Sequence, residues 1–165
     1  MAKKSPEQQL AVFIAKYEVN IQGLARDVLV RMRERLPGAV QLVYDNYNAL
    51  VVVFGPTERA SDAIFSIALY PRWVNLFFAH GANLPDAKKI LQGSGNQVRS
   101  VRLKSAEDLD AAPVRALMQI ALQRAGCSLD DATQARLVIK SISAKQRSRR
   151  PDAGRERRDR KGTSD

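Results

Sequence analysis

The strongest constraint on the fold is a series of four short segments rich in β-branched and aromatic residues. They span residues 40–44, 49–54, 63–70 and 73–78. Residues of these types favour the pleated, half-buried surface of a strand. The connections contain Asp45-Asn46, Gly55-Pro56 and Pro71-Arg72, which are typical of turns. Short turns join neighbouring antiparallel strands, so the sequence predicts a β-meander.

Helical patterns lie on both sides of this series. Ser5 and Gln8 have the spacing of a capping box, and the apolar residues that follow predict a helix over residues 6–17. Asn20 is the expected N-cap of a second helix, which ends before Pro37-Gly38.

The later chain predicts further elements, namely a short helix over residues 86–91, extended structure over 98–104, a helix over 114–125 and a last strand over 136–143. A run of strands with helices before and after it is typical of an α+β fold. We therefore expect two layers, with an antiparallel β-sheet packed against helices.

Length and composition predict one domain, residues 1–144, followed by a disordered basic tail, residues 145–165. Of the 165 residues, 45% are hydrophobic, which is enough for one packed core. Residues 1–144 hold 18 Lys and Arg against 13 Asp and Glu, and residues 145–165 hold 9 against 4. Half of the net charge of +10 therefore lies in the tail. No large apolar residue follows Ile142, so this tail cannot bury enough surface to order itself.

Neither a membrane span nor an export signal is recognisable in the sequence. No apolar run reaches about eighteen residues, and the short apolar run near the start does not have the form of a signal-peptide core. Cys127 is the single cysteine, so no internal disulfide can form. We expect a cytoplasmic protein without a membrane partner.

One stretch of the chain resembles a known family. It contains Asn75-Leu-Phe-Phe-Ala-His80-Gly81, Leu84-Pro85, Leu91-x-Gly93-x-Gly95 and Arg99-x-x-Arg102. This pattern is similar to that of the YdhG-like domains of unknown function, and the likeness extends over residues 20–150. The resemblance implies an α+β domain in which helices cover an antiparallel sheet.

Some YdhG-like members are described as frataxin-like iron chaperones. Iron handling of that kind needs a cluster of carboxylates, because iron ions favour oxygen ligands. The helix expected after Asn20 instead has four arginines against two acidic residues. An iron chaperone is therefore the second alternative for function.

An anion-binding site is the leading hypothesis for small ligands. His80 is expected where a strand meets a loop, a frequent place for functional side chains. Gly93 and Gly95 form a glycine-rich loop, and Arg99 and Arg102 follow it. Backbone N–H groups and guanidinium groups together can hold a phosphate or carboxylate. The alternative is that the glycines only turn the chain and that His80 bonds nearby backbone.

Catalysis is not favoured by any motif. His80 is the only histidine and Cys127 the only cysteine, so neither a His–Cys metal cluster nor a recognised nucleophile motif can be assembled. No metal site and no cofactor are expected. Trp73 and Phe77-Phe78 are interpreted as core and interface residues rather than as base-stacking platforms.

The tail is a second candidate for binding. Its basic residues could neutralise phosphates of RNA or DNA with little sequence preference; they are Arg147, Arg149, Arg150, Arg155, Arg157, Arg158, Arg160 and Lys161. The alternative is a solubilising tail. The sequence as a whole predicts a non-enzymatic binding module for a small anion or a protein partner, with nucleic-acid binding through the tail as the first alternative.

Overall fold

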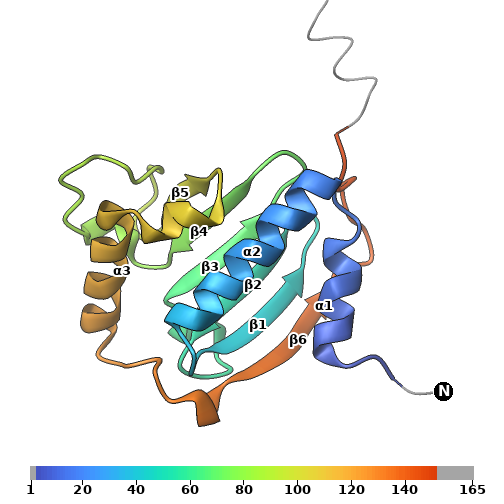
Figure 1. Ribbon diagram of the computed structural model, residues 1–165, viewed down its shortest axis with the longest axis horizontal. Helices are drawn as coiled ribbons and strands as arrows, with labels where there is room; N and C mark the ends of the chain where they lie inside the picture. Colours follow the sequence, from blue (N-terminus) through green and yellow to red (C-terminus); the bar gives the residue numbers. More distant parts are fainter. Residues whose placement is uncertain (1–2, 152–165) are drawn as a thin grey trace, which may run out of the picture.

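A mixed six-stranded sheet lies at the centre of the protein, whose computed structural model describes residues 3–151 (Figure 1). In these residues the α-helices and strands are, in chain order, α1 (Pro6–Ile14), α2 (Val19–Arg35), β1 (Val40–Asp45), β2 (Leu50–Gly55), β3 (Phe65–Leu69), β4 (Val74–Phe78), β5 (Arg99–Leu103), α3 (Ala112–Ala125) and β6 (Arg136–Ile142). The spatial order of the strands is β5-β4-β3-β2-β1-β6.

The α+β fold with a sheet packed against helices is confirmed, and strands β1 to β5 form the expected antiparallel meander. β6 differs from the expectation because it pairs with β1 in parallel. Turn residues between neighbouring strands predict hairpins only. The chain returns to β1 through β5 and α3, and local turn signals do not specify the direction of so distant a strand.

The start of the N-terminal helix is confirmed by a capping box in which Ser5 and Gln8 each accept from the other's backbone N–H, but the helix ends at Ile14 rather than at residue 17. The second helix begins at Val19, so Asn20 is not its N-cap.

The helix expected over residues 86–91 is wrong. The carboxylate of Asp86 accepts from the backbone N–H groups of Ile90 and Leu91, both at 2.9 Å, and Lys89 has a positive φ of 53°. Side-chain acceptors of this kind compete with helical hydrogen bonds, so the segment closes as a turn instead.

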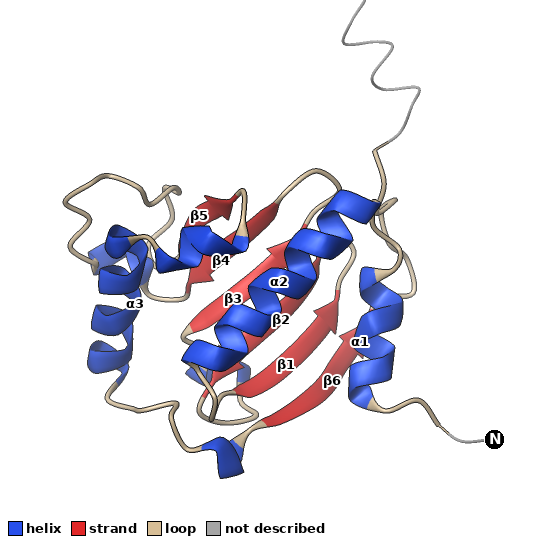
Figure 2. Ribbon diagram, in the orientation of Figure 1, coloured by secondary structure: helices blue, strands red, loops and turns tan. Residues whose placement is uncertain are grey.

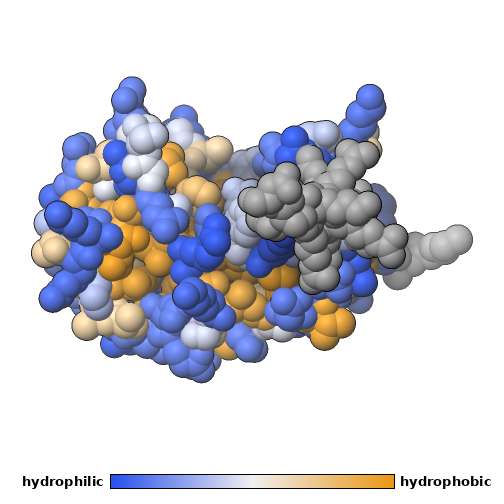
Figure 3. All heavy atoms as spheres, turned by 90° about the horizontal axis from the view of Figure 1, so that it is seen from above, coloured by the Kyte–Doolittle hydropathy of each residue, from blue (hydrophilic) through white to orange (hydrophobic). Residues whose placement is uncertain are grey.

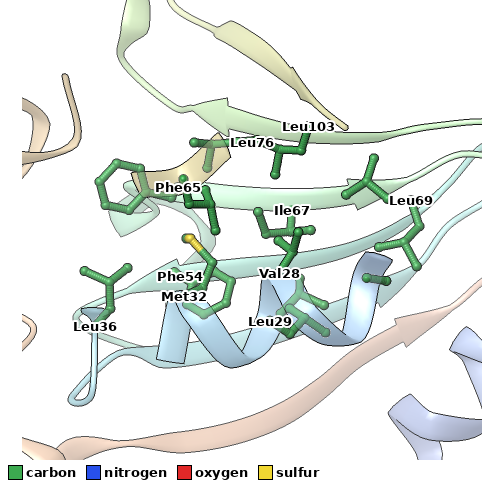
Figure 4. Packing of buried hydrophobic residues seen from close by; sticks show 14 of the residues in the cluster. Val28, Leu29, Met32, Leu36, Phe54, Phe65, Ile67, Leu69, Leu76 and Leu103 are labelled. Atoms are coloured by element: carbon green, nitrogen blue, oxygen red, sulfur yellow. The ribbon is translucent and has the colours of Figure 1, made fainter. Parts of the chain in front are cut away.

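The core lies between the helices and one face of the sheet. α2 lies in front of the sheet, with α1 beside it near β6 (Figure 2). Side chains of α2 point towards side chains from β2, β3, β4 and the end of β5 (Figure 4). The buried hydroxyl of Tyr17 donates to the backbone oxygen of Leu69 at 2.8 Å and accepts from the N–H of Leu50 at 3.1 Å. This bridge fixes the α1–α2 connection against β2 and β3.

The opposite side of the sheet, called the open face below, has no helix packed into it from residues 3–151. All buried side chains of α1, α2 and α3 belong to the core of the other face. Alternation along the paired strands places these residues on the open face: Val40, Leu42, Tyr44, Val51, Val53, Ser66, Ala68, Asn75, Phe77, Ser100, Arg102, Arg136, Val138 and Ser141. Val51, Val53, Phe77 and Val138 are partly exposed there.

The C-terminal segment, residues 143–151, packs against the end of β1. Its backbone N–H groups at Ser143 and Arg147 donate to the backbone oxygens of Asp45 and Tyr47, both at 2.9 Å. The guanidinium of Arg149 donates to the carboxylate of Asp45 at 2.9 Å, and these two side chains are 3% and 1% exposed. The tail was predicted to begin at residue 145, but the packed chain continues to residue 151 because Asp45 supplies a buried anion for Arg149.

Replacing Arg149 with Met is expected to lower the free energy of unfolding by about 3 kcal/mol, because a buried carboxylate loses its buried partner. Lys16 still donates to Asp45 at 2.9 Å, which keeps the loss below the upper end of the usual range. Chemical denaturation measures the difference. The exposed Arg147 is the matched control, and an equal loss in Arg147→Met would contradict the assignment of Arg149 as the buried partner.

Stability is also expected to depend on pH through Asp45. Burial acts to raise the pKa of Asp45, but hydrogen bonds from Lys16 and Arg149 outweigh it, so the pKa lies below its ordinary value. A lowered carboxyl pKa stabilises the folded state above the unfolded value of about 3.9 and loses that contribution as pH falls through the folded pKa. The free energies of unfolding of the native chain and of Asp45→Asn, measured against pH, should therefore converge below about pH 4. A constant difference down to acid pH would exclude this linkage.

Candidate functional site

The five residues of the expected anion site do not converge on one pocket, although Arg99 lies against Gly81, the residue after His80. His80 follows β4 at one end of the sheet, and Arg99 begins β5 next to Gly93 and Gly95. Arg102 lies further along β5, where it pairs in register with Asn75 on the open face. The structure therefore does not bring His80, Arg99 and Arg102 into a single pocket.

His80 lines a cavity of about 320 Å³ at the end of the sheet where β2 and β4 finish. Asp62, Arg124 and Cys127 line the same cavity, together with apolar residues of α3 and of the β2–β3 connection. Asp62 accepts from the Thr57 hydroxyl at 2.6 Å, and Arg124 donates to the backbone oxygen of Asn83 at 2.6 Å. One carboxylate and one guanidinium offset each other here, so this cavity does not select an anion by charge.

Cys127 and His80 line one cavity, although they are far apart in the sequence. Burial raises the pKa of the Cys127 thiol, and the carboxylate of Asp62 raises it further. A nucleophilic cysteine needs the opposite shift, because the thiolate is the reactive form. The surroundings of Cys127 therefore favour the unreactive thiol.

The loop that contains Gly93 and Gly95 is closed by hydrogen bonds from Arg99. The guanidinium of Arg99 donates to the backbone oxygens of Gly95 at 2.6 Å and Val98 at 2.8 Å. The backbone oxygens of the loop, rather than its N–H groups, therefore face this guanidinium. Gly93 has a φ of 126°, a conformation that glycine adopts far more readily than other residues. Turning of the chain accounts for these glycines without a ligand.

Arg102 lines a second cavity, called the basic cavity below. Its guanidinium carbon is 4.4 Å from the centroid of the Trp73 ring. The basic cavity has a volume of about 310 Å³. It is lined by Arg102 and Trp73 together with Arg72, Lys104 and the first turn of α2. No acidic residue is among the described residues that line it. Figure 3 views the end of the molecule where α2 begins, and there hydrophilic side chains stand between apolar areas.

Two residues of the basic cavity are not predicted by the sequence to lie in a site. Arg72 is expected in a turn and Trp73 in the core or an interface, whereas Lys104 follows Arg99 and Arg102 downstream of the glycine-rich loop. The β3–β4 turn places Trp73 beside Tyr70, with ring centroids 5.7 Å apart and the Tyr70 N–H donating to the Trp73 oxygen at 2.9 Å. The sequence does indicate that these hairpin residues are exposed, because residues between Leu69 and Val74 in a tight hairpin point away from the core.

The basic residues expected to bind nucleic acid through the tail are partly used by the fold. Arg149 is buried, Arg147 lies over the Tyr47 ring at 5.5 Å, and Arg150 donates to the backbone oxygen of Lys16 at 3.3 Å. The remaining residues lie outside the described part of the chain; they are Arg155, Arg157, Arg158, Arg160 and Lys161.

The chain was compared with protein-family models, with curated proteins and with solved structures, and nothing matched. Among residues 3–151, no group of three or more His, Cys, Asp or Glu side chains is placed to hold a metal ion. No helix in the same residues is long and apolar enough to cross a membrane.

The thiol of Cys127 is expected to react slowly with iodoacetamide near neutral pH, with a reaction midpoint above that of a free cysteine. Asp62→Asn should move this midpoint to lower pH, since it removes the charge that helps to raise the pKa. The rate of alkylation against pH measures both. Glu34→Gln, a change to an exposed residue of α2, is the control. A midpoint near that of free cysteine in the native chain would show that the thiol is not desolvated.

Proposed function

We propose that the chain is a YdhG-like, non-enzymatic binding module and that its ligand presents a phosphate-type anion to the basic cavity. The observation that supports this most directly is that Arg102 lies over the Trp73 ring, with its guanidinium carbon 4.4 Å from the ring centroid, and lines one cavity together with Lys104. A cytoplasmic location belongs to the same proposal.

Arg102 is suited to bind such an anion because its guanidinium is already oriented. Stacking on the Trp73 ring restrains the guanidinium plane and leaves its in-plane N–H groups free to point outwards. Less conformational freedom is then lost when it binds an anion. Charge-assisted hydrogen bonds from Arg to phosphate oxygens are among the stronger polar contacts of proteins.

The His80 cavity supports this function less well. It contains Asp62 as well as Arg124, so an anion would meet attraction and repulsion together. Its thiol is held in the protonated form, which also argues against a nucleophilic enzyme. Binding without turnover is therefore the function that the arrangement of charges supports best.

Inorganic pyrophosphate is a suitable probe of this proposal. At low ionic strength, Arg102→Gln should weaken its binding about tenfold, because a charged hydrogen-bond donor is lost. Chemical shift changes of backbone amides at Trp73 and Lys104 measure the affinity and locate the site. Arg115→Gln, at an exposed position of α3, should leave the affinity unchanged. Binding that responds to His80→Ala and not to Arg102→Gln would contradict the proposal.

A further inference from the structure

We infer that the anion recognised by the basic cavity is the backbone of single-stranded nucleic acid, whose bases lie on the open face of the sheet. This inference rests on the proposed function and adds the class of partner to it. It concerns the sheet itself rather than the basic tail. The contacts, exposure and charge of the open face each support it.

Aromatic side chains are available on the open face beside the basic cavity. Tyr70 and Trp73 form a pair across the β3–β4 turn, inclined by 35°. Phe77 lies on β4, directly after the turn that holds Trp73, and Tyr44 lies on β1; all four rings are partly exposed. Single-stranded nucleic acids bind to aromatic rings and guanidinium planes because every base has a face that can stack. The Arg102–Trp73 stack offers such a plane directly.

The rest of the open face is apolar and lacks a covering layer from residues 3–151. Val51, Val53 and Val138 are partly exposed, and Leu42 and Ala68 lie between them in the strand register. None of these five side chains belongs to the main core. Leu42 and Ala68 are 1% and 2% exposed, so the apolar side chains that a partner could contact here are the three partly exposed valines.

Charge distinguishes nucleic acid from an apolar protein partner. The charged residues paired in register at open-face positions are Arg102 and Arg136, and Lys140 lies at the bulge of β6; all three are basic. Glu58 accepts from Arg136 at 2.9 Å and so belongs to the far rim, away from Arg102. Lys104 adds a positive charge beside Arg102. A surface that combines stacking groups with positive charge complements a single strand, whose bases are exposed, better than a duplex, whose base faces are hidden.

Trp73 is the single tryptophan of the chain and therefore reports on this surface alone. The full-length protein is titrated with a 12-nucleotide oligo(dT), with a duplex of the same length and with inorganic polyphosphate of matched charge. Saturable quenching of Trp73 fluorescence is expected with the single strand, and at least tenfold weaker binding with the duplex and with polyphosphate. Contacts made only by the basic tail would bind the oligonucleotide without changing Trp73 fluorescence.

Variants of the full-length chain separate stacking from charge. Trp73→Leu should weaken oligo(dT) binding about tenfold in fluorescence anisotropy, the loss that removal of one stacking ring produces. Arg102→Lys should retain the salt dependence and weaken binding, whereas Arg102→Gln should reduce the slope of log affinity against log salt by about 0.7. Tyr47→Leu and Arg115→Gln are the controls, since Tyr47 lies in the β1–β2 turn and Arg115 on α3. Thermal unfolding of each variant confirms that it is folded.

The outcomes distinguish this inference from the proposed function. If pyrophosphate binds through Arg102 but oligo(dT) binds no more tightly than polyphosphate, the anion site stands and the nucleic-acid inference is overturned. If Trp73 fluorescence does not respond to oligo(dT) at low salt, the inference is overturned whatever the variants show. If neither pyrophosphate nor oligo(dT) binds at the basic cavity, both proposals fail.

Discussion

Burial of a single face of the sheet is the constraint on which the rest of the structure depends. The helices α1, α2 and α3 all contribute their buried side chains to one core, and this apolar burial is the main favourable term in folding. The other face has to be stabilised within the sheet, by cross-strand neighbours. Leu42 illustrates this, because it is 1% exposed although it lies outside the main core and is flanked by Val53 and Val138. One-sided packing therefore leaves a sheet surface for contacts other than folding.

A buried carboxylate determines where the packed chain ends. Asp45 lies at the end of β1 on the core side, where a lone negative charge would be costly. Lys16 and Arg149 reach it from opposite ends of the chain, so the pair joins the α1–α2 connection to the C-terminal segment. Such a network is not optimal for stability, since the Nε of Arg149 is buried without a hydrogen-bond partner in the described structure. Its contribution is to specify one position for residues 143–151, and removing that segment to test the tail would also remove part of the fold.

The sequence predicted the local elements well and the long-range arrangement poorly. Strand composition and turn residues identified β1 to β5, and the capping residues of α1 identified its start, because these signals act between near neighbours. The parallel pairing of β6, the burial of Arg149 and the separation of His80 from Arg102 depend on contacts between distant residues. For the candidate site, Arg102 and Lys104, which follow the glycine-rich loop in the sequence, both line the basic cavity. The sequence did not predict that Arg72 lies beside them, since nothing in its spacing showed that a hairpin and a strand end would meet.

The distribution of charge follows from the same one-sided packing. On the helix side, Arg31 and Arg35 are paired with Asp110, and Arg33 with Glu7, so many positive charges there are neutralised locally. Arg102 has no carboxylate within salt-bridge distance in residues 3–151 and instead covers the Trp73 ring. An aliphatic side chain would cover that ring as well, but it would leave no N–H donors at the surface. A guanidinium stacked on an exposed ring keeps both a planar surface and charge available, and this combination gives the open face its chemical character.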